Sequence, residues 1–165
     1  MLPSLYEIPV PCSGRLFIMP KPSSDWLRDD LIKLKEFGVS RLVSMLTLEE
    51  INELSLEDEP NISRELGLEF TNLSVPDRTV PEAWQVSELV ASIQKDLGRD
   101  LGVAIHCRAG IGRSGLTAAC VLIAEGMDAG AAMDLVTEAR GVNTPDTQEQ
   151  AEFVRKFRLQ GAGSG

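Results

Sequence analysis

The sequence has little of what marks secreted, membrane-spanning or nucleic-acid-binding proteins. Its 165 residues include only three cysteines, an odd number without the spacing of a disulfide framework. No apolar run approaches the length of a membrane span, and no basic segment followed by an apolar one opens the chain as an export signal would. The net charge of −9 disfavours polyanionic partners. We therefore expect a cytoplasmic protein, monomeric, that binds neither nucleic acid nor a membrane.

The composition is that of an ordinary globular protein, with 43% hydrophobic and 25% charged residues. A chain of this length suits one compact domain with a real core. We expect that domain over residues 1–160. The last residues, 161–165, contain only glycine, alanine and serine, and we expect a flexible tail there.

Apolar runs alternate with amphipathic segments along the chain. Strands are predicted at residues 15–19, 39–46, 68–73 and 101–105. Helices are predicted from Ser23 or Ser24 to 37, from Pro81 to 97, over 116–124, from Asp128 to 140, and from Thr144-Pro145 to 159, with acidic helical pieces over 47–66 that Pro60 interrupts. This alternation predicts a single α/β domain with a central, mostly parallel, twisted sheet of four to five strands flanked by helices.

The most informative stretch is His-Cys-Arg-Ala-Gly-Ile-Gly-Arg-Ser, residues 106–114. An apolar run precedes it and another follows it, which places it at a strand-to-helix turn, where backbone N–H groups and the helix dipole converge on an anion. Two glycines allow the backbone to curl around that anion. The sequence therefore predicts a phosphate-binding loop with Cys107 at its floor. Its phosphate-binding residues are Arg108, Ala109, Gly110, Ile111, Gly112 and Arg113.

This stretch resembles the His-Cys-x5-Arg-Ser/Thr signature of the cysteine-based protein tyrosine phosphatase superfamily. The resemblance extends over about residues 14–159 and favours the small dual-specificity branch, particularly enzymes like kinase-associated phosphatase. It implies metal-independent hydrolysis of a phosphomonoester through a phosphocysteine intermediate, with no cofactor and no metal site. The structural alternative, in which Cys107 is a small buried hydrophobe beside an ordinary turn, does not explain the surrounding pattern.

Four residues of the stretch itself have expected roles. Cys107 would attack phosphorus as a thiolate, because the loop amides and Arg113 lower the pKa of its thiol. Arg113 would grip two phosphate oxygens with its planar fork. Ser114 would donate a hydrogen bond to sulfur, cap the helix, or do both. The resemblance implies that His106, the only histidine, sits behind the loop, orders it and favours the thiolate.

Two residues outside the stretch complete the expected catalytic set. Asp77 follows a predicted strand and is expected to be the general acid, although Pro76-Asp77 also suits a simple turn. The resemblance extends to the Asp77–Pro81 loop, which in such enzymes closes over bound substrate. Gln150 matches the glutamine of the final catalytic helix, which would place the attacking water. Gln148 stays open as the alternative.

The expected substrate is a phosphorylated protein or peptide. No equivalent of the Asn-x-x-Tyr substrate loop of larger tyrosine-specific enzymes is present, and the only tyrosine is Tyr6. This implies a shallower pocket that admits phosphoserine and phosphothreonine besides phosphotyrosine. The loop lacks the lysines of phosphoinositide-cleaving relatives, a role that Arg108 fills only in part. Two alternatives stay open: a catalytically idle phosphate-binding scaffold, and a phosphatase of an inositol phosphate, a lipid or an RNA 5′ end.

Other side chains are assigned less specifically. The arginines that could line the rim of the site are Arg15, Arg78, Arg108 and Arg140. Cys120 is expected to lie too far along its helix to pair with Cys107. Cys12 lies in a predicted loop, where an idle thiol is favoured over a redox partner of Cys107.

Overall fold

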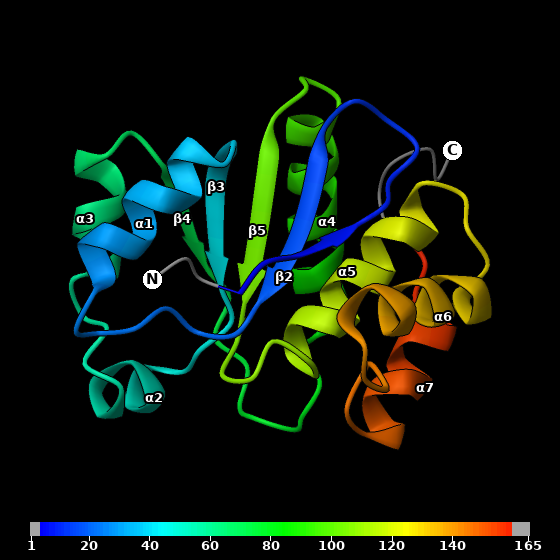
Figure 1. Cartoon of the computed structure of the whole chain (residues 1–165). Helices are drawn as coiled ribbons and strands as arrows, with labels where there is room; N and C mark the ends of the chain where they lie inside the picture. Colours follow the sequence, from blue (N-terminus) through cyan, green and yellow to red (C-terminus); the bar gives the residue numbers. More distant parts are fainter. Residues whose placement is uncertain (1–3, 160–165) are drawn as a thin grey trace.

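The central layer of the molecule is a five-stranded sheet, seen in a computed structural model that describes residues 4–159 (Figure 1). Its order is β1-β2-β5-β3-β4, and only β1 runs antiparallel to its neighbour. The strands are β1 (Tyr6–Ile8), β2 (Arg15–Met19), β3 (Val39–Ser44), β4 (Glu69–Asn72) and β5 (Gly102–His106). The predicted fold class is thereby confirmed.

Seven helices within the described residues cover the sheet. The helices α1 (Leu27–Glu36) and α3 (Glu59–Glu65) lie on one side, and α4 (Ala83–Leu97), α5 (Arg113–Ala124), α6 (Ala129–Arg140) and α7 (Gln148–Lys156) lie on the other, whereas α2 (Leu48–Glu53) lies below the sheet in the view of Figure 1. None of these helices is long and apolar enough to cross a membrane.

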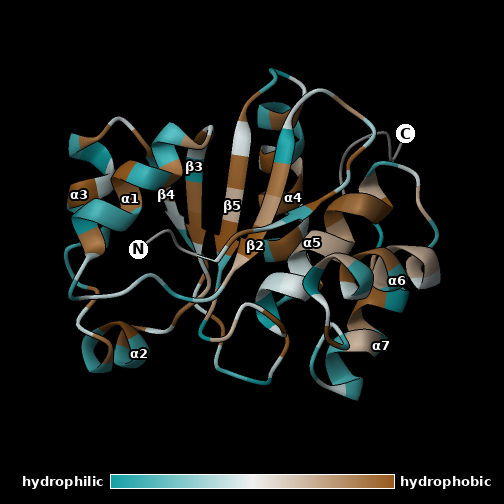
Figure 2. Cartoon of the chain, in the orientation of Figure 1, coloured by the Kyte–Doolittle hydropathy of each residue, from teal (hydrophilic) through white to brown (hydrophobic). Residues whose placement is uncertain are grey.

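The strand β5 lies at the centre of the sheet and is buried along its whole length. Val103 and Ile105 belong to the core beneath α4 and α5, while Ala104 belongs to the core on the α1 side. A strand covered on both faces has a continuous apolar sequence, as β5 has in Figure 2. This run is the signal by which the sequence predicts the strand. Such a strand holds the residue after its carboxyl end in a fixed position.

Several predicted boundaries are wrong. Neither Ser23 nor Ser24 caps α1, which begins at Leu27; the backbone N–H of Ser23 instead donates to the Asp30 carboxylate at 3.1 Å. Pro60 does not interrupt a helix, because it lies in the first turn of α3, where its missing N–H has no intrahelical partner to lose.

The starts of the last helices also differ in part from the predictions. Asp128 caps α6 as predicted, accepting from the N–H of Ala131 at 3.2 Å. Thr144-Pro145 does not open α7, because the helix begins at Gln148 and is capped by Thr147. Pro81 stands two residues before the start of α4. The predicted tail, 161–165, lies outside the described residues.

Candidate active site

The predicted phosphate-binding loop connects the carboxyl end of β5 to the first residue of α5. Gly110 has φ +73°, and a Cβ there would meet the backbone nitrogen of Pro20 at 2.5 Å. The carbonyl of Arg108 accepts a hydrogen bond from the N–H of Lys21 at 3.2 Å. The loop thus packs directly on the segment that follows β2, at a point where only glycine fits.

Cys107 lies at the floor of this loop with 2% of its surface exposed. Its Sγ is 3.3 Å from the Oγ of Ser114. Burial alone would raise the pKa of the thiol, but hydrogen bonds from the Ser114 hydroxyl and N–H, the charge of Arg113 and the N–H of Ile111 together lower it below the ordinary value. A thiol in this position forms a nucleophilic thiolate more readily than a free cysteine does.

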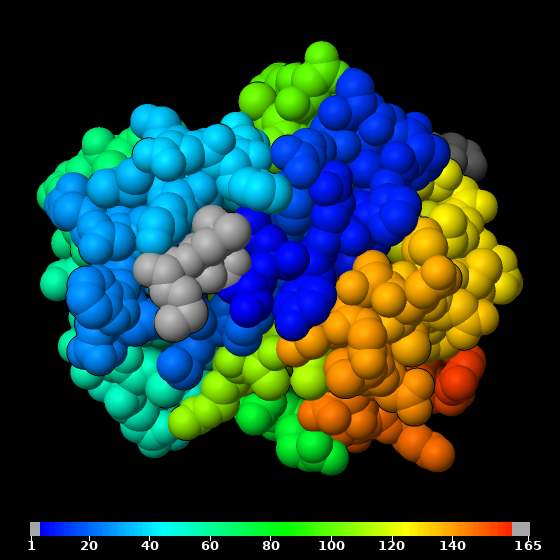
Figure 3. Space-filling view, viewed as in Figure 1, coloured from blue at the N-terminus to red at the C-terminus, as the bar shows by residue number. Residues whose placement is uncertain are grey.

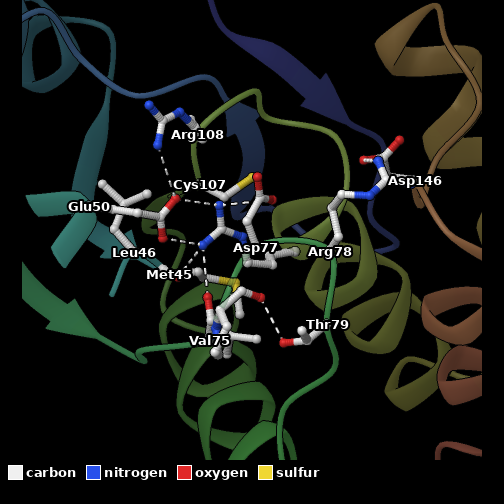
Figure 4. Close-up of polar contacts among 12 residues, drawn as sticks. Met45, Leu46, Glu50, Val75, Asp77, Arg78, Thr79, Cys107, Arg108 and Asp146 are labelled. Carbon is white, nitrogen blue, oxygen red and sulfur yellow. Dashed lines mark hydrogen bonds and ion pairs between the residues drawn. The ribbon is translucent and has the colours of Figure 1, made fainter. Parts of the chain in front are cut away.

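Arg113 is almost fully buried, and Glu50, which is labelled in Figure 4, binds its guanidinium. Its Nη1 and Nη2 donate to the two Glu50 oxygens at 2.7 and 3.0 Å, and Nη1 also donates to the carbonyls of Met45 and Val75. Its Nε is buried and has no hydrogen-bond partner within residues 4–159. The guanidinium therefore keeps a donor for an oxyanion while Glu50 fixes its orientation.

Asp77 lies over the same guanidinium. Its Oδ1 is 3.1 Å from Nη2 of Arg113, and just over half of its side chain is exposed. The Asp77 carboxyl thus lies beside the guanidinium of Arg113 and is open to solvent on its other side. This position is compatible with proton transfer to a group bound by Arg113.

His106 is fully buried behind the loop. Its Nδ1 is 3.2 Å from the carbonyl of Cys107, and its Nε2 is 2.6 Å from a Glu59 oxygen, with Glu59 itself 1% exposed. The imidazole therefore connects α3 to the residue that carries the thiol. It does not lie at the surface where a substrate would bind.

Gln150 is buried at the start of α7, next to the loop. A Cβ on Gly112 would come within 3.0 Å of the Gln150 amide, and the Gln150 Nε2 donates to the carbonyl of Thr79 at 3.2 Å. Its Oε1 accepts from the backbone of Asp146 and Thr147. The structure thus brings Gln150 to the loop and to the segment after Asp77, whereas Gln148 is exposed.

Two of the four rim arginines border the site, and both pair with carboxylates. Nη1 of Arg108 lies 3.7 Å from Glu50 and 3.8 Å from Glu53. Arg78, whose φ is +64°, forms an ion pair of 3.0 Å with Asp146. In Figure 3 the segments that carry these residues meet at the lower edge of the molecule.

Of the other two arginines, one contacts the loop itself and the other lies away from it, so the assignment of Arg15 to the rim is wrong. Arg140 donates to the loop carbonyls of Gly110 and Ala109, and its guanidinium lies over the ring of Tyr6. Arg15 pairs in register with Gly102 at the amino end of β5, so it lies at the end of the sheet opposite the loop. There its guanidinium bonds to Glu7 and stacks on Phe17 and Phe37.

The sequence does not reveal Glu50 or Glu59, the two acids that hold Arg113 and His106. The only signal for Glu50 is the Thr47-x-x-Glu50 capping box, which predicts a helix start and says nothing of an arginine 63 positions away. Glu59 lies in an acidic segment, a pattern that predicts a solvent-exposed helix face.

Together, a buried thiol with two backbone N–H groups directed at it, a held guanidinium and a facing carboxyl, all at the carboxyl end of a central strand, define a cysteine-based phosphatase fold and site. The family described as "Polymorphic toxin system, DSP-PTPase phosphatase" matches residues 19–127. The chain belongs to this family of dual-specificity and tyrosine phosphatase-like proteins.

Comparison with individual proteins agrees with this family. The chain is 26% identical over 137 residues to cyclin-dependent kinase inhibitor 3 of Rattus norvegicus; the match covers 80% of this chain and 63% of that relative. It is 30% identical over 157 residues to protein tyrosine phosphatase domain-containing protein 1 of Bos taurus, covering 88% of this chain and 19% of the relative. The chain thus spans less than two thirds of these relatives.

Solved structures show the same fold. Kinase-associated phosphatase with its catalytic-site cysteine replaced by serine superposes with a TM-score of 0.89 at 21% identity, over 99% of this chain and 98% of that one. Tk-PTP in its active form gives 0.79 at 24% identity, over 97% and 99%. PTPMT1 in complex with PI(5)P gives 0.73 at 21% identity, over 88% and 90%.

Proposed function

We propose that this protein hydrolyses phosphomonoesters through a phosphocysteine intermediate and acts on phosphorylated proteins or peptides. One observation carries the proposal: the buried Cys107 thiol, with its lowered pKa, shares its loop with a guanidinium that Asp77 also faces. Nucleophile, phosphate clamp and general acid are then within reach of one phosphoryl group.

In the first step, the Cys107 thiolate attacks phosphorus and forms the S–P bond while the P–O bond to the leaving group breaks. Arg113 and the loop N–H groups hold the equatorial oxygens, whose charge the helix N-terminus also stabilises. The protonated carboxyl of Asp77 gives its proton to the departing oxygen, so that an alcohol or phenol leaves instead of an anion.

In the second step, water attacks phosphorus and the S–P bond breaks. Asp77, now a carboxylate, accepts a proton from that water, and inorganic phosphate is the product. The thiolate leaves with the hydrogen bond from Ser114, which lies 3.3 Å from the sulfur. Gln150 lies beside Gly112 and is the residue that we assign to orienting the water.

A singly phosphorylated protein suits the rim better than a phosphoinositide or an RNA 5′ end. Both rim arginines are paired with carboxylates, Arg108 with Glu50 and Glu53, and Arg78 with Asp146. A ligand with several phosphates would need free cations at this rim. We therefore propose phosphotyrosine, together with phosphoserine and phosphothreonine, as the class of substrate.

The site supports catalysis over an idle phosphate-binding scaffold because thiol, guanidinium and acid are all present.

We also propose that the protein works in the cytoplasm. Cys12, Cys107 and Cys120, the three cysteines of the chain, are all free thiols, as expected in a reducing compartment.

The test is turnover of p-nitrophenyl phosphate, with and without a metal chelator. We expect activity that the chelator leaves unchanged and that Cys107→Ser abolishes. The matched control is Cys12→Ser, which removes an exposed thiol and should keep wild-type activity. Turnover that survives in Cys107→Ser contradicts the mechanism. Phosphopeptides carrying each phosphoresidue, compared with a phosphoinositide, then define the substrate class.

A further inference from the structure

The contact between His106 and Glu59 is a buried ionisable pair that the proposed reaction steps do not use. Nε2 and the carboxylate oxygen are 2.6 Å apart, and the two residues are 0% and 1% exposed. Two ionisable side chains are taken out of water here at a considerable free-energy cost. Glu59 comes from the first turn of α3, on the side of the sheet opposite α5 (Figure 1).

The hydrogen-bond partners determine where the protons of the His106 ring lie. The carbonyl of Cys107 can only accept, so Nδ1, at 3.2 Å, must carry a proton. When Glu59 is ionised, its carboxylate also only accepts, so Nε2 then carries a proton as well. With both nitrogens protonated, the ring is an imidazolium cation. The short contact to Glu59 is what a charge-assisted hydrogen bond produces.

The electrostatic balance agrees with this assignment. Burial would lower the pKa of His106, but the charge of Glu59, its hydrogen bond, and the carbonyl and charge of Cys107 together raise it above the ordinary value. The other charged groups around the thiol are Arg113 and, through it, Glu50 and Asp77. The imidazolium therefore adds a second cation beside the sulfur.

We propose that Glu59 is a positioning residue for the nucleophile: its buried carboxylate keeps the His106 ring doubly protonated and fixed behind the loop, so that the Cys107 thiolate faces a permanent positive charge. This inference rests on the proposed function for its biological meaning. Its physical content, the protonation state of one ring and its effect on one thiol, can be measured without turnover.

The first experiment uses the unaltered protein. His106 is the only histidine in the chain, so ¹⁵N labelling of histidine gives one ring to observe by NMR. We expect both ring nitrogens to be protonated at neutral pH and through the range where a free imidazole loses its proton. A ring with one unprotonated nitrogen at neutral pH overturns the proposal. Because no substitution is involved, loss of folding cannot obscure the answer.

The second experiment measures the rate of Cys107 alkylation by iodoacetamide against pH, in Cys12→Ser protein to remove the exposed thiol. Glu59→Gln keeps the size of the side chain and removes its charge. In this variant we expect the midpoint of the pH dependence of the alkylation rate to rise by about one pH unit. Alkylation is then about tenfold slower than in the wild type at pH values below the wild-type midpoint. Glu57→Gln is the control, since it removes an exposed charge two residues away and should leave the midpoint unchanged.

The outcomes separate this inference from the proposed function. An unchanged midpoint in folded Glu59→Gln overturns the role of Glu59, even if the protein is an active phosphatase. If phosphate esters are not hydrolysed but the midpoint still depends on Glu59, the proposed function fails and the inference about the thiol is supported.

Discussion

Glu50 accepts hydrogen bonds from both terminal nitrogens of Arg113, at 2.7 and 3.0 Å, and so fixes the plane of the guanidinium from α2. The same Glu50 oxygen that binds Nη1 accepts from the backbone N–H of Thr47 at 3.1 Å, which ties the pair to the start of α2. Arg113 therefore does not depend on substrate for its orientation. The cost of ordering its long side chain is met during folding.

Removing this carboxylate should weaken phosphate binding as well as turnover. In Glu50→Gln the amide presents an N–H₂ toward one Arg113 nitrogen, so one hydrogen bond is lost and the guanidinium loses its buried counter-charge, keeping only the more exposed Asp77. We expect kcat/KM to fall about a hundredfold, with weaker inhibition by vanadate. The control is Glu49→Gln, an exposed acid of the same turn. A variant that loses turnover but binds vanadate normally would contradict the positioning role of Glu50.

Ser114 is expected to control the acid limb of the pH profile. Its hydroxyl lowers the pKa of the Cys107 thiol, so Ser114→Ala should raise that pKa. At each pH below the new value a smaller fraction of the thiol is ionised, and the rising limb of kcat/KM moves to higher pH. The pH dependence of kcat/KM for p-nitrophenyl phosphate measures this shift. Ser114→Thr, which keeps a hydroxyl, is the conservative comparison, and a limb that does not move in Ser114→Ala contradicts the assignment.

Gly110 and Gly141 form a matched pair for testing how closely the loop packs. Their φ angles are +73° and +85°, but a Cβ at Gly110 would meet backbone at 2.5 Å, whereas none lies within 4 Å at Gly141. Gly141→Ala should cost about 1 kcal/mol of unfolding free energy from the backbone conformation alone. Gly110→Ala should cost about 1–3 kcal/mol more from overpacking. If denaturant titrations gave the same loss of unfolding free energy for both variants, the loop would be able to move away from Pro20.

The local parts of the site could be predicted from the sequence because the signals are local. The apolar run of β5 and the glycines before Arg113 identify a strand, a turn and a helix in one continuous stretch. Asp77 follows strand β4 by a few residues, so the parallel sheet brings it to the same edge. Each of these inferences uses residues that are close in the sequence or neighbouring strands.

The supporting residues could not be predicted because their contacts are long-range. Glu59 meets His106 across 47 positions, and no periodic pattern encodes that contact. Arg140 is polar and close to a helix end, which reads as an exposed side chain, yet it bonds to carbonyls of the loop. The strand β1 has three residues, too few to show an alternation, and it is defined by its antiparallel pairing with β2.

The ion pair between Arg78 and Asp146 connects the segment that carries Asp77 to the turn before α7, at 3.0 Å. Arg78 has the positive φ that most residues avoid, so the segment adopts a conformation that its surroundings must stabilise. With side-chain exposures of 64% and 41%, the pair should add less than about 1 kcal/mol to the unfolding free energy. Its effect on the position of Asp77 should be larger than its effect on stability.

We therefore expect Arg78→Ala and Asp146→Ala each to lower kcat for a phosphotyrosine peptide about threefold. The double variant should also lose only about threefold, because either change breaks the same contact. Activity on p-nitrophenyl phosphate should change less, since a good leaving group needs little protonation. The control is the comparably exposed pair of Arg155 and Glu152 on α7, whose replacement by alanine should leave both rates unchanged. A double variant whose loss is the product of the two single losses would show that the residues act independently, and the ion pair would then have no part in placing Asp77.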